Sequence, residues 1–120
     1  MSLDPNLPVL IGVGAAHQRH EEPGAGLDTT GLMAEAVATA VADTGSAGVT
    51  ARVDWIAATR GLSGLPDAAR RIAESLGVAA FTVAADAGIP QQTLVNHALE
   101  AVRSGRAQVA IVCGGETKFR

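Results

Sequence analysis

The sequence predicts an α/β fold in which a parallel sheet is covered by helices. Apolar segments of strand length alternate with segments of helical period, in the order βαβαβαβ. Such alternation is typical of parallel sheets with right-handed crossovers. The chain has 120 residues, the size of one domain, and contains no repeat or low-complexity linker. We therefore expect residues 1–120 to form a single domain.

Residues 81–116 show the strand–helix–strand pattern most clearly. FTVAA at 81–85 is a short apolar strand, DAGIP at 86–90 is a turn, and AQVAIVCGGE from 107 is a second buried strand. The helix between them places one apolar stripe on the sheet, formed by Leu94, Val95, Ala98 and Val102. Ligands of open parallel sheets bind where strands end and helices begin, so the turn at 86–90 is the first candidate site.

The remaining elements follow the same logic. We expect four strands near residues 9–14, 53–59, 81–85 and 107–113, with three helices between them. Asp28, Thr29 or Thr30 can cap the first helix, and Gly45 ends it. Pro66 suits the first turn of the second helix, which Gly77 ends. The inward stripes of these two helices are Leu32, Ala36, Val37, Ala40 and Val41 in the first, and Leu65, Ala69, Ile72 and Leu76 in the second.

Composition narrows the function classes. The hydrophobic fraction is 48% but the aromatic fraction is 2%, so Ala, Val, Leu and Ile must build the core. The net charge is −3 and no basic stripe exists, which argues against a nucleic-acid partner. No apolar run reaches membrane-spanning length, and no signal peptide pattern precedes the first strand. The single cysteine excludes an internal disulfide, so we expect a cytoplasmic protein.

Two N-terminal motifs are weak. Gly12-Val13-Gly14 closes the first expected strand as a dinucleotide fingerprint would, but the third glycine is replaced by His17 and a polar loop delays the helix. We interpret these glycines as sites of close backbone packing. His17 and His20 lie near two glutamates, but no third ligand has suitable spacing, so we expect no metal site.

Other reactive side chains have structural interpretations. His97 lies within the third helix and has no evident acidic partner. Cys113 lies inside an apolar strand, where burial raises a thiol pKa and makes the group a poor nucleophile. The arginines flanking the second loop are interpreted as a solvated face, although they could meet a phosphate; they are Arg60, Arg70 and Arg71. Gly114-Gly115 permits a tight backbone approach or an unusual φ, and Glu116 stays open as a ligand or a structural acid.

Taken together, these segments resemble the N-terminal half of the thiolase superfamily, especially the acetyl-CoA acetyltransferases related to sterol-carrier thiolases. The resemblance spans nearly the whole chain, from PVLIGVG through LMAEAVATAVADTG to ALEAVRSGRAQVAIVCGGET. The last segment is the most specific of the three. The resemblance implies a layered α/β architecture made from two similar halves, an acyl-CoA substrate and, usually, a dimer. It also implies that the strand order is third, second, first, fourth.

The resemblance also shows two departures. Thiolases carry a nucleophilic cysteine at the start of the third helix, where the helix dipole favours the thiolate. The matching residues 85–91 (ADAGIPQ) contain no cysteine. The His and second Cys motifs of the family belong to a C-terminal half that does not follow here, so we expect a fragment of a longer chain without catalytic residues of its own.

The leading expectation is therefore the N-terminal domain of a thiolase-like acetyl-CoA acetyltransferase, inactive alone, with a coenzyme A thioester as possible substrate and no cofactor. Asp86, Gly88 and Gln91 should line the mouth of the site, with Asp86 capping the helix or orienting a ligand. We also expect a homodimer through Phe81–Ala85, an apolar strand at the sheet edge. A non-catalytic acyl-CoA-binding or assembly module and a nucleotide-binding α/β domain are the alternatives.

Overall fold

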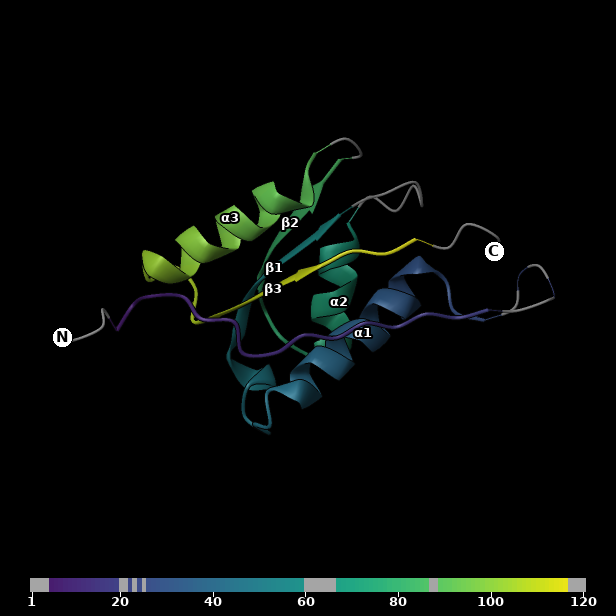
Figure 1. Cartoon of the computed structure of the whole chain (residues 1–120), viewed down its shortest axis with the longest axis horizontal. Coiled ribbons are helices and arrows are strands. Elements are labelled where there is room, and N and C mark those ends of the chain that lie inside the picture. Colours follow the sequence, from purple (N-terminus) through teal and green to yellow (C-terminus); the bar gives the residue numbers. More distant parts are fainter. Residues whose placement is uncertain are drawn as a thin grey trace.

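The computed structural model describes residues 5–19, 22, 24, 26–59, 67–86 and 89–116. Within these ranges the chain forms, in order, α1 (Thr29–Asp43), the short 3-10 helix η1 (Thr50–Arg52), β1 (Val53–Thr59), α2 (Ala68–Leu76), β2 (Phe81–Ala85), α3 (Gln91–Arg103) and β3 (Val109–Cys113) (Figure 1). The three predicted helices are present. The strands predicted at 53–59 and 81–85 have those bounds, and the strand predicted from 107 begins at Val109.

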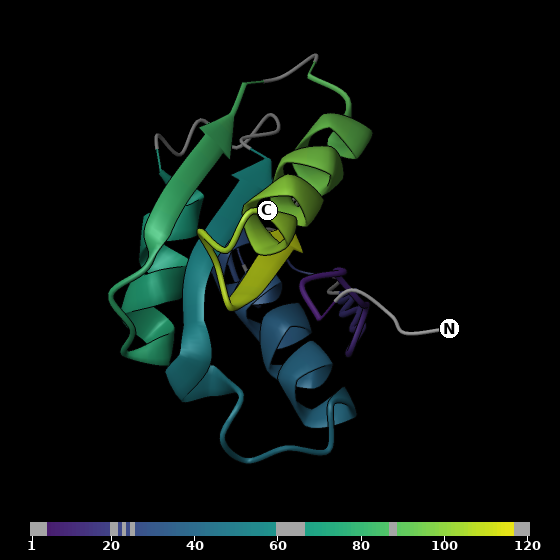
Figure 2. The same ribbon diagram turned by 90° about the vertical axis from the view of Figure 1, so that its left-hand side faces the viewer.

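The sheet is parallel and has the order β2-β1-β3. Helix α3 covers one face, and α1 and α2 cover the other, so the molecule has three layers (Figure 2). The central strand β1 pairs with both neighbours, with Thr59 opposite Ala85 of β2 and Ala58 opposite Cys113 of β3. Among the described strands no neighbouring pair is antiparallel, as predicted.

The strand predicted at 9–14 is wrong, and with it the predicted strand order. Residues 5–19 contain no helix or strand, and β3 lies directly beside β1. The N-terminal segment instead runs along α1 (Figure 1). A Cβ on Gly12 would overlap the carbonyl oxygen of Ala40, and a Cβ on Gly14 would overlap that of Ala36. The two glycines therefore hold the segment against the helix backbone, which is the packing interpretation made from the sequence.

Local signals explain where the helices begin and end. Asp28 caps α1, because its Oδ1 accepts from the Gly31 N–H at 2.8 Å. Asp67 caps α2 in the same way through the Arg70 N–H; the predicted Pro66 lies outside the described residues. Gly77 ends α2 in the left-handed conformation, with φ of 70°. None of the helices in the described ranges is long and apolar enough to cross a membrane.

The core divides between the two faces of the sheet. Ile56 and Ala58 of β1 face α1 and α2, where they contact Met33, Val37, Ala69 and Ile72 among others. Trp55 and Ala57 face α3, where they contact Leu94, Ala98 and Ala101. The predicted stripes are therefore correct in outline, apart from Leu65, which lies outside the described residues. They differ where Met33 rather than Ala36 fills the core on α1, and where Ala101 is more deeply buried than Val102 on α3.

A β-bulge interrupts the alternation of β1. The register with β3 shifts between Val53 and Trp55, which lie opposite the consecutive residues Val109 and Ala110. As a result Val53 joins the core under α1 and α2, whereas Trp55 joins the core under α3. Residues two apart on a regular strand would share one face. Asp54 is the extra residue that makes this switch.

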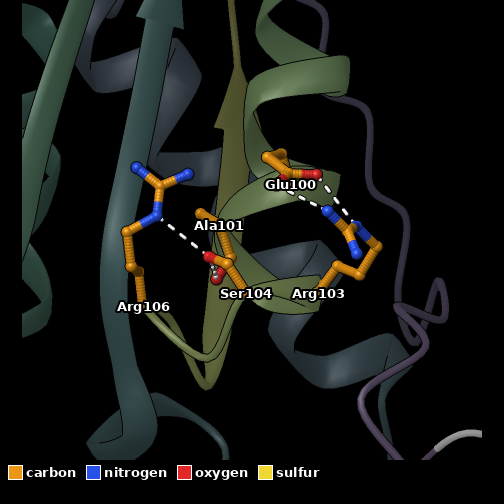
Figure 3. Close-up of polar contacts among 5 residues, drawn as sticks. All are labelled: Glu100, Ala101, Arg103, Ser104 and Arg106. Atoms are coloured by element: carbon orange, nitrogen blue, oxygen red, sulfur yellow. Dashed lines mark hydrogen bonds and ion pairs between the residues drawn. The ribbon is translucent and has the colours of Figure 1, made fainter.

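The end of α3 carries a small polar network (Figure 3). Arg103 donates to both carboxylate oxygens of Glu100, at 2.9 and 2.8 Å. These hydrogen bonds hold the pKa of Glu100 below its ordinary value. Arg106 Nε donates to Ser104 Oγ at 2.9 Å, and Ser104 Oγ donates to the Ala101 carbonyl. Because α3 runs opposite to the strands, this network lies at the amino end of the sheet.

Candidate functional site

The candidate site lies along the carboxyl edge of the sheet. Strands β1, β2 and β3 end at Thr59, Ala85 and Cys113, and because they are parallel these ends share one edge. Thr59 is the central point of that edge, since it lies opposite Ala85 and next to the position where β3 continues into Gly114. The turn that leads into α3 therefore starts at Asp86, directly after Ala85, the β2 residue that lies opposite Thr59.

The β2–α3 turn holds the three residues predicted to bind substrate. Asp86 follows β2 directly and is exposed, and Gln91 is the exposed first residue of α3. Gly88 lies outside the described residues. The Ile89 N–H donates to the Asp86 carbonyl at 3.2 Å, which closes the turn. The structure thus places Asp86 and Gln91 at the two ends of one short turn.

Asp86 is not the cap of α3, so that part of the prediction is wrong. The N-cap position is Pro90, and no side chain there accepts a hydrogen bond from the helix. The Thr93 N–H bonds instead to the Pro90 carbonyl at 3.0 Å. Proline fixes the backbone angle that a helix entry needs, so the helix begins without a capping carboxylate. Orientation of a ligand by Asp86 stays a prediction.

The backbone of Gly114 lies directly against the side chain of Thr59 at this edge. A Cβ on Gly114 would overlap Oγ1 of Thr59, and a Cβ on Gly115 would lie 3.0 Å from Cγ of Met33. Neither glycine has a positive φ, so of the two interpretations given for this pair the tight approach is correct. Sequence reasoning missed Thr59. Its signal was that it is the last residue of a buried strand, at the edge where ligands bind.

Cys113 is shielded rather than reactive. Its Sγ donates to the Ala57 carbonyl at 3.7 Å, and burial raises the pKa of the thiol to about 11. The side chain lies with Ile111 on the α1 and α2 face of the sheet, opposite to the face that α3 covers. The thiol therefore points away from the start of α3. The half-buried side chain and its raised pKa agree with the sequence-based interpretation of Cys113 as a structural residue.

Arginines lie at both ends of the sheet. Arg70 and Arg71 are exposed in the first turn of α2, which starts at the carboxyl edge. Arg70 makes a long ion pair with Glu74, at 3.8 Å. Arg60 lies outside the described residues. Arg103 and Arg106 lie at the opposite, amino end of the sheet, where they form the polar network at the end of α3. Of these arginines within the described residues, Arg70 and Arg71 are the pair at the carboxyl edge.

The histidines gather into no site among the residues that the structure describes. His17 and His97 are exposed on different segments, and His20 lies outside the described residues. No three His, Cys, Asp or Glu side chains of the described ranges group closely enough to hold a metal ion. Glu116 is exposed beyond the end of β3, beside the glycine pair. Its position at the carboxyl edge is compatible with either interpretation given for it.

Comparison with solved structures decides the fold. The crystal structure of a monomeric SCP2-thiolase like protein type 1 from Mycobacterium smegmatis superposes with a TM-score of 0.79, at 28% identity over 97% of this chain. The chain has an SCP2-thiolase-like fold. A scan against protein-family models finds no match, and neither does a search of curated proteins. The resemblance seen in the sequence is thus confirmed at the level of the fold.

The match covers only part of the solved relative. The chain corresponds to 25% of that protein's length. The shared part contains the parallel sheet and the β2–α3 turn, which are the features that the thiolase-like resemblance singled out.

Proposed function

We propose that this chain is the acyl-CoA-binding N-terminal domain of a thiolase-like acetyl-CoA acetyltransferase and that it forms no acyl-enzyme by itself. The observation that carries the proposal is the β2–α3 turn at the carboxyl edge of an SCP2-thiolase-like sheet. Parallel α/β sheets bind ligands at this edge. The turn's exposed polar residues give a small ligand something to contact.

Asp86, Gly88 and Gln91 are the proposed contacts for the thioester end of the ligand. Gln91 offers an amide that both donates and accepts, and it is exposed at the first position of α3. Coenzyme A is an anion, so its phosphates need a cationic partner on the same edge. Arg71 is exposed in the first turn of α2 and is the proposed partner.

Covalent acyl transfer of the thiolase kind needs a thiolate at the start of α3, and no residue of this chain is proposed for that role. Residues 85–91 contain no cysteine. Cys113 lies on the other face of the sheet, with a pKa raised to about 11. An acyl group on Asp86 would be an anhydride, which makes that carboxylate a poor acceptor. Binding without acyl transfer is therefore the chemistry that these residues support.

The proposal includes a cytoplasmic homodimer that pairs through β2. This strand is an edge of the sheet, and Phe81 on it is 67% exposed. An open edge with apolar side chains favours pairing with another chain. The solved relative is described as monomeric, so the oligomeric state of this chain needs its own measurement.

Calorimetric titration tests the binding. Acetyl-CoA and free CoA should bind, and NADP should not, because Gly12 and Gly14 are occupied in packing against α1 rather than open to a pyrophosphate. Arg71→Glu should weaken CoA binding by about tenfold through loss of one charge-assisted contact. Arg106→Glu, at the opposite end of the sheet, is the matched control and should leave it unchanged. Binding of NADP but not CoA would favour the nucleotide-binding alternative instead.

Mass spectrometry after incubation with acetyl-CoA tests the absence of acyl transfer. The chain should keep its unmodified mass, and acetoacetyl-CoA should undergo no thiolysis. A stable acetyl group on a peptide containing Cys113 or Asp86 would overturn this part of the proposal. Failure of CoA to bind at all would leave the assembly module as the better description.

A further inference from the structure

Thr59 places a hydroxyl group at the centre of the carboxyl edge. It is the half-buried last residue of the central strand β1, and it lies opposite Ala85 of β2. Side chains alternate between the two faces of a strand. Trp55 and Ala57 belong to the cluster beneath α3, so Thr59 lies on that same face, at its carboxyl end. The Thr59 side chain is therefore on the side of the sheet where the β2–α3 turn leads into α3.

Gly114 leaves room for this hydroxyl. A Cβ on Gly114 would overlap Oγ1 of Thr59 and would lie 3.4 Å from its Cβ and Cγ2, so Oγ1 fills the place that a side chain at residue 114 would take. No hydrogen bond joins Thr59 Oγ1 to another group in the described ranges. A hydroxyl can both donate and accept. Thr59 thus offers a polar atom, without a partner among the described residues, at the edge where parallel sheets bind ligands.

We propose that Thr59 Oγ1 donates a hydrogen bond to the carbonyl oxygen of the bound thioester, and that Gly114 keeps the space for this contact open. The inference rests on the proposed binding of acyl-CoA at this edge, and it gives Thr59 the task of telling a thioester from a thiol. A thioester carbonyl accepts a hydrogen bond, whereas free CoA ends in a thiol and lacks this acceptor. The phosphates, which both ligands share, are left to Arg71.

Calorimetric titration of Thr59→Val with acetyl-CoA and with free CoA tests the contact. Valine keeps the β-branched shape that suits a strand and removes the hydroxyl. Thr59→Val should weaken acetyl-CoA binding about fivefold, the loss of one neutral hydrogen bond, and leave free CoA unchanged. Thr59→Ser keeps the hydroxyl and should retain most of the preference for the thioester. Thr82→Val is the matched control, since Thr82 is half-buried in β2 opposite Ile56, away from the carboxyl edge.

A small thioester separates this inference from the proposed function. S-acetyl-N-acetylcysteamine is the thioester end of acetyl-CoA without its nucleotide. Its addition should shift the NMR amide signals of Thr59 and Gly114 in the wild type, and shift them much less in Thr59→Val.

The outcomes are distinct. If neither acetyl-CoA nor CoA binds, the proposed function fails, and the small thioester still decides the role of Thr59. Thr59 signals that do not move in the wild type would overturn the inference. So would a Thr59→Val variant that binds both CoA ligands as the wild type does, or one that weakens both equally. The wild-type shifts and the Thr59→Ser titration keep the test decisive if Thr59→Val does not fold.

Discussion

The carboxylate of Asp54 accepts hydrogen bonds from the backbone N–H of Gln108, at 3.0 and 3.1 Å, and from that of Val109 at 3.3 Å. Asp54 is the bulge residue of β1, and Gln108 immediately precedes β3. A side chain therefore replaces the backbone ladder at the point where β3 joins the sheet. This explains why β3 begins at Val109 rather than at residue 107.

Asp54→Ala should lower the free energy of unfolding by about 1–3 kcal/mol, because two backbone donors at the start of β3 lose a charged acceptor. Asp54→Asn keeps one acceptor oxygen in the same place and should lose less. Urea denaturation monitored by circular dichroism measures both. Glu74→Ala removes an exposed partner of a weak ion pair and should change stability by less than about 0.5 kcal/mol. Equal effects of Asp54→Ala and Glu74→Ala would contradict the assigned contact.

Gly114→Ala should destabilise the fold by about 1–3 kcal/mol, because the added Cβ overlaps Oγ1 of Thr59. The overlapping atom belongs to a side chain, so the combination with Thr59→Ala should restore part of the loss. A double-mutant cycle of unfolding free energies measures this coupling. Gly48→Ala, where an added Cβ meets nothing within 4 Å, is the control. Additive effects in the cycle would show that the two residues do not constrain one another.

Stability should fall at alkaline pH through Cys113. Burial raises the pKa of its thiol from 9.0 to about 11 in the folded state, so between these values the unfolded chain releases a proton that the folded chain keeps. Stability is therefore fully present below pH 9 and is lost as the pH rises towards 11, by up to about 2–3 kcal/mol. The chain contains no tyrosine to add to this titration. Cys113→Ala should flatten the decline, measured as the urea midpoint at successive pH values, and an equal slope in both proteins would contradict it.

Replacing Val83 with proline should convert the proposed dimer into monomer or aggregate, because proline cannot donate to a strand pairing across the β2 edge. Phe81→Lys is a gentler variant, since it places a charge on an exposed position of that edge without altering the backbone. Sedimentation velocity measures both. A sedimentation profile that neither substitution changes would count against pairing through β2.

The elements with strong local signals could be predicted from the sequence. The helix starts follow from Asp28 and from the turn before Gln91, and the bounds of β1 and β2 follow from short apolar runs. The alternation of strand and helix then fixes the parallel sheet. The carboxyl edge, and with it the β2–α3 turn, follows from that topology alone.

Other features depended on contacts that no local pattern contains. Residues 9–14 have strand-like composition, but Gly12 and Gly14 let them lie on α1 and the sheet closes without them. The bulge at Asp54 needs Gln108, 54 residues away, and Thr59 gains its role only when Gly114 is beside it. For Asp86 the sequence suggested a cap, but Pro90 occupies that position.

The division of the core between two faces has a consequence for optical measurements. Trp55 is the only tryptophan of the chain, no tyrosine accompanies it, and its side chain lies in the cluster beneath α3. Intrinsic fluorescence excited at the tryptophan band therefore reports on the α3 side of the sheet. Helices α1 and α2 contact the other face, so loosening of either helix alone would leave the emission spectrum nearly unchanged. If the fluorescence transition precedes or follows the loss of helical circular dichroism, the two faces of the sheet lose their packing at different stages of unfolding.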